Sequence, residues 1–190
     1  LDNSNIKLAI GRAGNVIGGG DWAQDRIVVD CMESWSKNIA VDIRNPNATR
    51  PWQHVLEPLS GYLKLGQDLS NDSSLNGSAF NFGPNSDQNH TVENLLRDLS
   101  KFWNFSDESK AYKIKNNSEF HEAGLLKLNC DKALFYLNWK ANLDYENTIK
   151  YTSKWYFNFY KEDIDMYEYT KNQISDYELS AKIKNFSWTE

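Results

Sequence analysis

Three side chains in the first fifty residues have the chemistry to bind an anionic ligand: Asn15, Arg26 and Arg50. Asn15 follows a predicted strand, Arg26 stands at the start of a predicted helix, and Arg50 precedes a strand that contains Trp52. Strand ends and helix starts in α/β proteins are frequent sites for anions. Two guanidinium groups and an amide are suitable donors to a diphosphate.

The same arginines could instead form ion pairs within the protein, with carboxylates such as Asp21, Asp25 or Glu57. Spacing along the chain favours neither reading. Four of the five arginines lie in the first fifty residues, whereas lysine supplies nearly all the later positive charge. Arginine suits bidentate phosphate recognition better than lysine does.

A glycine-rich stretch, Gly18 to Ala23, formally matches the G-x-G-x-x-A fingerprint of dinucleotide-binding proteins. That fingerprint requires its first glycine directly after a strand, so that the next helix begins at the pyrophosphate. Residues 11–17 separate the predicted strand from Gly18, and the bulky Trp22 lies inside the turn. We therefore predict no dinucleotide loop here.

The other familiar catalytic patterns are not found. His121-Glu122 lacks the second histidine of H-E-x-x-H, and no G-x-S-x-G or Walker A motif is present. Cys31 and Cys130 form no paired motif, and no metal site is predicted. His54, placed in a strand, is expected to be structural, and the aromatic residues near 155–160 are expected to belong to the core.

The elements that must position these side chains are a mixture of short strands and helices, without the regular strand–helix alternation of a complete nucleotide-binding sheet. Strands are predicted at residues 6–10, 41–43, 52–55, 79–82, 111–115 and 125–128, with a glycine-dense turn at 11–20. Helices are predicted from residue 27, from Pro58, and at 92–103, 131–139 and 145–160, with a helical segment after 163. Asp25, Thr91 and Asp131 are the expected N-caps.

Composition limits the class of protein. The chain has 190 residues, a net charge of −5, 40% hydrophobic residues and 25% charged residues. These values fit a folded protein and argue against nucleic-acid binding driven by charge. No apolar run approaches the length of a membrane span, no signal peptide is visible, and a cytoplasmic location is expected.

Several segments resemble the CDP-glucose 4,6-dehydratases, nucleotide-sugar enzymes of the extended short-chain dehydrogenase/reductase superfamily. The resemblance covers roughly residues 6–160 and is most specific between Arg12 and Tyr62. The matching segments are 12–23, 25–28, 43–46, 48–62, 80–84, 121–123, 126–128, 132–133 and 137–139, with Thr152 and Trp155-Tyr156. Asn129 and Val29 depart from the family pattern, which has aspartate and proline there.

The resemblance implies an α/β fold: the C-terminal portion of an extended short-chain dehydrogenase/reductase. This portion comprises the last strands of a Rossmann-type sheet and a small mixed α/β substrate-binding domain. We expect that unit at residues 1–162 and a charged helical tail at 163–190. An open sheet edge and an exposed apolar face are also expected.

The family's NAD loop and Tyr-x-x-x-Lys catalytic pair are not found at the expected places. The spacing does occur at Tyr167 and Lys171, but in the unmatched tail. The isolated chain is therefore predicted to be inactive, with its catalytic groups in a missing N-terminal half.

The implied reaction converts CDP-glucose to CDP-4-keto-6-deoxyglucose and water, with NAD as cofactor. Nucleic acid and membranes are not expected partners, and homo-oligomers stay open for the full-length enzyme. Carried over by position, Asn15 and Arg50 would bind the diphosphate and Arg26 a phosphate or ribose. Glu122 would accept from the cytosine amino group, and the backbone at Ala13 and Gly14 would border the nicotinamide.

Two alternatives stay open. The chain could be a non-catalytic nucleotide-sugar-binding or assembly module, complete as it stands. It could also derive from a related nucleotide-sugar epimerase or reductase of the same superfamily.

Overall fold

The computed structural model describes residues 6–115 and 126–189. Within these residues, short strands pair into four two-stranded ladders, of which three are parallel. The pairs are β1 (Ile10–Ala13) with β6 (Ala79–Phe82), β2 (Asn15–Ile17) with β5 (Trp52–His54), β3 (Val41–Ile43) with β8 (Tyr112–Ile114), and, antiparallel, β4 (Thr49–Arg50) with β7 (His90–Thr91).

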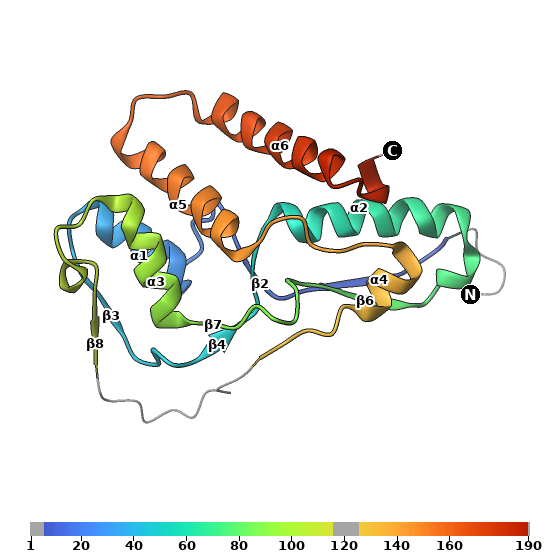
Figure 1. Ribbon diagram of the computed structural model, residues 1–190, viewed down its shortest axis with the longest axis horizontal. Helices are drawn as coiled ribbons and strands as arrows, with labels where there is room; N and C mark the ends of the chain where they lie inside the picture. The colour runs from blue at the N-terminus through green and yellow to red at the C-terminus, as the bar shows by residue number, and fades with distance from the viewer. Residues whose placement is uncertain (1–5, 116–125, 190) are drawn as a thin grey trace.

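Helices cover these ladders (Figure 1). They are α1 (Ile27–Ser36), α2 (Leu56–Asn71), α3 (Val92–Ser100), α4 (Asp131–Leu137), α5 (Tyr145–Lys161) and α6 (Met166–Ile183). Short 3-10 turns occur at η1 (Ser73–Leu75), η2 (Lys101–Trp103), η3 (Glu108–Lys110) and η4 (Ser187–Thr189). Helix α2 runs along the β1–β6 pair, and α6 folds back beside α5.

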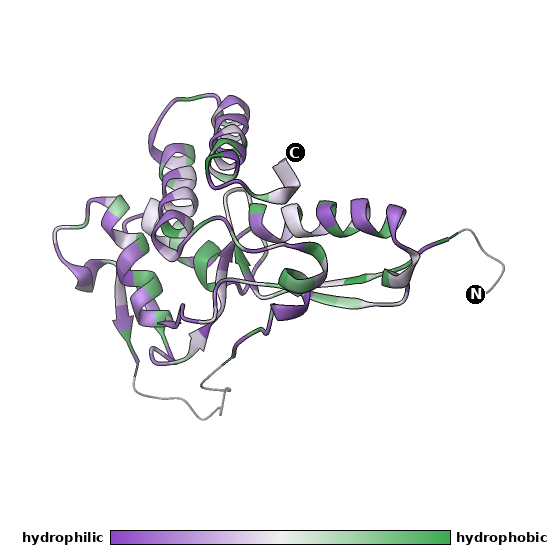
Figure 2. Ribbon diagram, turned by 45° about the vertical axis from the view of Figure 1, so that its right-hand side comes forward, coloured by the Kyte–Doolittle hydropathy of each residue, from purple (hydrophilic) through white to green (hydrophobic). Residues whose placement is uncertain are grey.

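The larger of two hydrophobic cores lies among α1, α3 and α5. Leu95, Leu96 and Leu99 of α3 are completely buried, as the spacing of apolar residues in that helix predicts. Trp35 of α1 is also buried, and its indole donates to the carbonyl of Ala111 at 2.7 Å. The alternation of hydrophobic and hydrophilic residues along the helices is visible in Figure 2.

A second core joins the β1–β6 pair to α2 and α4. Phe80 and Phe82 of β6 are buried against Leu65 and Leu137. The outer surfaces of these helices carry large exposed side chains, including Leu63 of α2 and Phe135 of α4. Large apolar side chains are thus exposed on both helices.

The first predicted strand and the turn after it are displaced in the structure. Strand β1 begins at Ile10, not at Ile6, and β1 and β2 both run into the segment predicted as a turn. Before Ile10, Leu8 donates to the side chain of Asn76 and accepts from the backbone of Gly77, so this stretch is tied to a loop. Pairing with β6 and β5 outweighs the turn preference of the glycines.

Of the predicted N-caps, Thr91 is confirmed, because its hydroxyl accepts from the backbone N–H of Asn94 at 3.1 Å. The prediction for Asp25 is wrong: this residue has a φ of 62° and lies before the cap position, which Arg26 occupies. Asp131 is the first helical residue rather than the cap, and its N–H donates to the side chain of Asn129 at 3.0 Å.

The strand predicted at 125–128 is not formed at residues 126–128, while residue 125 lies outside the described residues. The helix predicted at 145–160 is confirmed as α5, and the segment after 163 is helical, as expected. No helix in the described part of the chain is long and apolar enough to cross a membrane.

Candidate functional site

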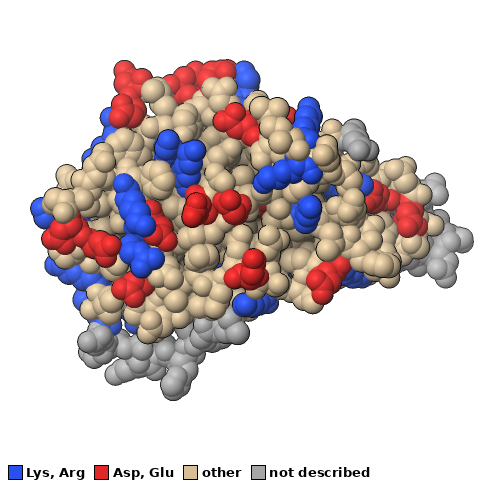
Figure 3. Space-filling view, in the orientation of Figure 1, with Lys and Arg blue, Asp and Glu red and all other residues tan. Residues whose placement is uncertain are grey.

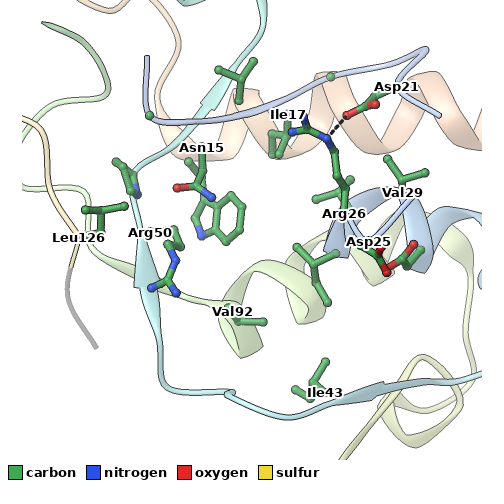
Figure 4. Close-up of a pocket in the computed structure, with 18 of the residues that line it drawn as sticks. Asn15, Ile17, Asp21, Asp25, Arg26, Val29, Ile43, Arg50, Val92 and Leu126 are labelled. Carbon is green, nitrogen blue, oxygen red and sulfur yellow. Dashed lines mark ion pairs between the residues drawn. The ribbon is translucent and has the colours of Figure 1, made fainter. Parts of the chain in front are cut away.

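A cavity of about 1550 Å³ opens between β2, β3, β5 and the start of α1. Its wall includes five of the six residues predicted to contact substrate or cofactor (Figure 4). They are Ala13, Gly14, Asn15, Arg26 and Arg50. The sixth, Glu122, lies outside the described residues. Residues far apart in the sequence thus meet at one place.

Asn15 and Arg50 come together through strand pairing. Asn15 is the partner of Trp52 in the parallel β2–β5 ladder, and Arg50 precedes Trp52 by two residues. Arg50 ends β4, and Pro51 separates it from β5. Asn15 and Arg50 lie on the same side of the cavity, as Figure 4 shows.

Arg26 lies on another side of the cavity, next to the loop that precedes α1 (Figure 4). Its guanidinium Nε is 3.6 Å from a carboxylate oxygen of Asp21. For Arg26, the ion pair left open by the sequence is thus formed. Both side chains are well exposed, so this pair contributes little to stability and leaves donors for a ligand.

Helix α5 fixes the loop that carries Asp21. The hydroxyl of Tyr156 donates to the carbonyl of Asp21 at 2.7 Å and accepts from its N–H at 3.1 Å. Trp155 packs so closely on Gly19 that a Cβ there would lie 2.0 Å from the indole. These aromatic residues were expected in the core, but their contact with the loop was not predicted, because the contacting residues Asp21 and Tyr156 are 135 positions apart in the sequence.

The surroundings of the glycine stretch agree with the prediction that it is not a dinucleotide-binding loop. Gly18 packs on Val55, Gly19 packs on Trp155, and helix α1 begins only at Ile27. These glycines allow close approach of protein side chains, whereas a dinucleotide loop needs its backbone facing a ligand.

Charge around the cavity is mixed. Asp42 and Arg44 from β3 and the loop after it also line the wall, and Asp42 pairs with Lys115 at 2.6 Å. On the face shown in Figure 3, acidic and basic side chains are interspersed, with no extended positive region. Binding of an anion must therefore depend on individual donors rather than on the overall field.

His54 is a structural residue, as predicted. It is 3% exposed, its ring packs edge-on against Tyr151, and its Nδ1 accepts from the N–H of Leu56 at 3.4 Å. Burial lowers the pKa of His54 to about 4, so the ring is neutral at physiological pH.

The most perturbed carboxyl group lies away from the cavity. Glu57 of α2 is 1% exposed and belongs to a group of buried side chains that we term the α2–α6 polar cluster. The members of this cluster are Glu57, Ser60, Trp139, Asn142 and Tyr177. Burial raises the pKa of Glu57 to about 7.

Every contact of the Glu57 carboxylate is with the protein. It accepts from the N–H groups of Asn142 at 2.9 Å and Leu143 at 2.7 Å, and from the hydroxyl of Tyr177 at 3.2 Å. A perturbed pKa marks many active-site acids, but here it accompanies a fully hydrogen-bonded structural role.

The Tyr167 and Lys171 spacing in the tail has no relation to the cavity. Tyr167 is 73% exposed on α6, and Lys171 is hydrogen-bonded to Glu168 at 2.9 Å. Within the part of the chain that the structure describes, no group of His, Cys, Asp or Glu has the arrangement of a metal site.

Comparisons with known proteins agree on the fold. No family model matches the chain. CDP-glucose 4,6-dehydratase from Salmonella typhimurium is 39% identical over 176 residues, which cover 93% of this chain and 48% of that enzyme. The chain therefore spans about half the length of this curated relative, to which it is homologous.

Several solved structures are similar to this chain in fold. UDP-glucose-4-epimerase from Stenotrophomonas maltophila superposes with a TM-score of 0.68 and 16% identity, covering 85% of this chain and 51% of that one. dTDP-glucose 4,6-dehydratase from Bacillus anthracis, solved with NAD, has a TM-score of 0.63 and 12% identity, covering 80% and 44%. The predicted fold class, the C-terminal portion of an extended short-chain dehydrogenase/reductase, is confirmed, and both of these solved structures contain NAD.

Proposed function

We propose that this chain forms the nucleotide-sugar-binding part of a CDP-glucose 4,6-dehydratase and that its ligand is CDP-glucose. The observation that carries this proposal is the convergence of Asn15, Arg26 and Arg50 on one cavity. The homology to the Salmonella typhimurium enzyme over 93% of the chain supports the choice of reaction and nucleotide.

In this proposal, Asn15 and Arg50 donate to the diphosphate from one side of the cavity. Charge-assisted bonds from a guanidinium are the strongest such contacts, and an amide N–H adds direction. Arg26, held by Asp21 on another side, reaches the ribose or a phosphate oxygen. Glu122 remains our candidate for the cytosine amino group, which would favour CDP over nucleotides without that donor.

NAD, when bound, supplies the oxidation at the sugar C4 and the later reduction at C6. Among the described residues, only Ala13 and Gly14 are proposed to belong to the NAD site. Ala13 and Gly14 line the cavity, but the space beside Gly14 is occupied by Pro51, whose Cγ would lie 2.8 Å from an added Cβ. We propose that these two residues border the nicotinamide and that the rest of the enzyme binds most of the cofactor.

The chain's own role is to bind and orient the substrate. No Tyr-x-x-x-Lys pair stands before the Arg12 strand, where the family has the groups that move protons at C4, so the isolated chain is proposed to be inactive. Any conversion of CDP-glucose by the purified chain supplied with NAD would contradict this part of the proposal.

Calorimetric titration with CDP-glucose, UDP-glucose and dTDP-glucose tests the choice of ligand. We expect CDP-glucose to bind more tightly than the other two. Equal affinities would favour the alternative of a related epimerase or reductase, and no binding of any of the three would overturn the proposed function.

A further inference from the structure

One buried hydrogen-bond donor on the wall of the cavity has no partner. Trp52 is 5% exposed, and its indole Nε1–H meets no acceptor among the described residues. Trp52 nevertheless belongs to the residues that line the cavity. Because buried polar groups are almost always hydrogen-bonded, an unpaired donor at such a place needs an explanation.

Other unpaired buried polar atoms show that this state alone does not indicate a ligand. The described residues include four more, in Gln53, Trp103, Thr152 and Trp188. None of these four lines the cavity. Within the described part of the chain, Trp52 alone combines an unpaired buried donor with a place on the cavity wall.

Strand geometry places Trp52 with the two proposed diphosphate ligands. Trp52 is the register partner of Asn15 and follows Arg50 by two residues, and all three residues line the cavity. An indole N–H donates but cannot accept, and a guanidinium is likewise only a donor. A ligand rich in acceptor oxygens, such as a diphosphate, matches this set.

We propose that Trp52 is a further substrate-binding residue, whose indole N–H donates to an oxygen of the diphosphate held by Asn15 and Arg50. This inference rests on the proposed function and adds a neutral donor to it. The N–H is shielded from solvent in this structure, so its neighbours must shift when the ligand enters. Side-chain rearrangements of this size are common on binding.

Trp52→Phe tests the proposal, because it removes the N–H and keeps an aromatic ring. We expect CDP to bind about tenfold more weakly, which corresponds to about 1.4 kcal/mol. Trp103→Phe is the matched control, because it removes an equally unpaired indole N–H away from the cavity, and it should leave the affinity for CDP unchanged.

Indole ¹⁵N–¹H spectra give a second measurement on the unmodified chain. On saturation with CDP or with pyrophosphate, the Trp52 resonance should move downfield while that of Trp103 stays in place. If Trp52→Phe does not fold, the benzothienyl-alanine isostere at position 52 keeps the ring shape without the N–H and should show the same tenfold loss.

The outcomes separate this inference from the proposed function. Wild-type affinity for CDP in the position-52 variant, or a Trp52 resonance that does not move at saturation, would overturn the role of Trp52 and leave the proposed function standing. If the wild-type chain binds no CDP, both fall together. A resonance that responds to CDP but not to pyrophosphate would overturn the phosphate contact.

Discussion

The α2–α6 polar cluster and the cavity wall use polar side chains in opposite ways. In the cluster, the donors and acceptors around Glu57 satisfy one another across α2, α6 and the segment at Trp139 and Asn142. On the cavity wall, the guanidinium of Arg26 is half-exposed and the indole N–H of Trp52 is unpaired among the described residues.

This difference distinguishes the structural cluster from the proposed binding site better than pKa shifts do. The largest carboxyl pKa shift belongs to Glu57, whose hydrogen bonds are all within the protein. Among the described acids on the cavity wall, only Asp30 has a shifted pKa, which is raised mainly by burial. The proposed ligand site is therefore distinguished by unpaired or exposed donors on a cavity wall, rather than by a strongly perturbed pKa.

The largest expected effect is on the stability of the cluster. Glu57→Ala leaves the buried N–H groups of Asn142 and Leu143 without an acceptor and should lower the free energy of unfolding by about 3–5 kcal/mol. Urea denaturation followed by fluorescence measures it. Glu33→Ala, in an exposed pair with Lys37, should change stability by less than about 0.5 kcal/mol. A loss below about 1 kcal/mol for Glu57→Ala would show that the cluster is not a structural centre.

The pH dependence of stability gives the next effect. The pKa of Glu57 is about 7 in the folded protein, against an ordinary value of 4.5. Between these values the folded state retains a proton that the unfolded state releases, so stability falls as pH rises from 4.5 to 7, by about 3 kcal/mol in total.

His54 acts in the opposite direction, because its pKa of about 4 keeps it neutral while the unfolded chain takes up a proton below pH 6.5. Its contribution is lost as pH falls from 6.5 to 4. Comparing urea midpoints of the wild type and Glu57→Gln across pH 4–8 isolates the Glu57 component, because His54 is common to both. Parallel curves for the two proteins would contradict the assignment.

Binding should respond most to Arg50. Arg50→Ala removes a charge-assisted donor and is expected to weaken CDP binding by about 1.5–3 kcal/mol, measured by calorimetry. Arg97→Ala, which removes an arginine on α3 away from the cavity, is the control and should bind CDP as the wild type does. Unchanged affinity in Arg50→Ala would assign Arg50 a purely structural role.

A smaller effect, on both stability and CDP affinity, is expected at the contact between α5 and the loop that carries Asp21. Tyr156→Phe removes the hydroxyl that bridges the N–H and carbonyl of Asp21, the partner of Arg26. We expect stability to fall by about 1–2 kcal/mol and CDP affinity to fall about two- to fivefold. Tyr160→Phe, in the same aromatic group, should change neither quantity. A stability loss without any loss of affinity would show that the loop does not position Arg26.

The smallest effect is expected at the surface of α6. Lys171→Ala removes an exposed pair with Glu168 and should change both stability and CDP affinity by less than about 0.5 kcal/mol. Thermal unfolding and the same titration check this. A large loss of CDP affinity would mean that the Tyr167 and Lys171 spacing has a function that the structure does not indicate.

Much of the fold could be predicted because local patterns agree with tertiary packing. Helix α3 and its cap at Thr91 follow directly from apolar spacing and a hydroxyl at the right place. The first strand was misplaced because pairing with β6, a distant segment, decides where it begins. The prediction of Asp25 as an N-cap is wrong because its backbone has a φ of 62°. This conformation belongs to a loop that Tyr156 of α5 holds through a hydrogen bond to Asp21, a contact between distant segments.

The candidate site could be predicted in part. Strand ends and arginine chemistry indicated Asn15 and Arg50, and both residues line the cavity. The sequence cannot show that the indole of Trp52 lacks an acceptor or that Tyr156 reaches Asp21, because both facts depend on contacts between distant segments.

The close packing of Trp155 on Gly19 has a consequence for how such a chain can evolve. A side chain at position 19 would collide with the indole, whose nearest atom would lie 2.0 Å from the new Cβ. A larger residue at position 19 can therefore be accepted only together with a smaller residue at position 155. Among homologues we expect these two positions to covary, although 135 residues lie between them, as positions 20 to 154.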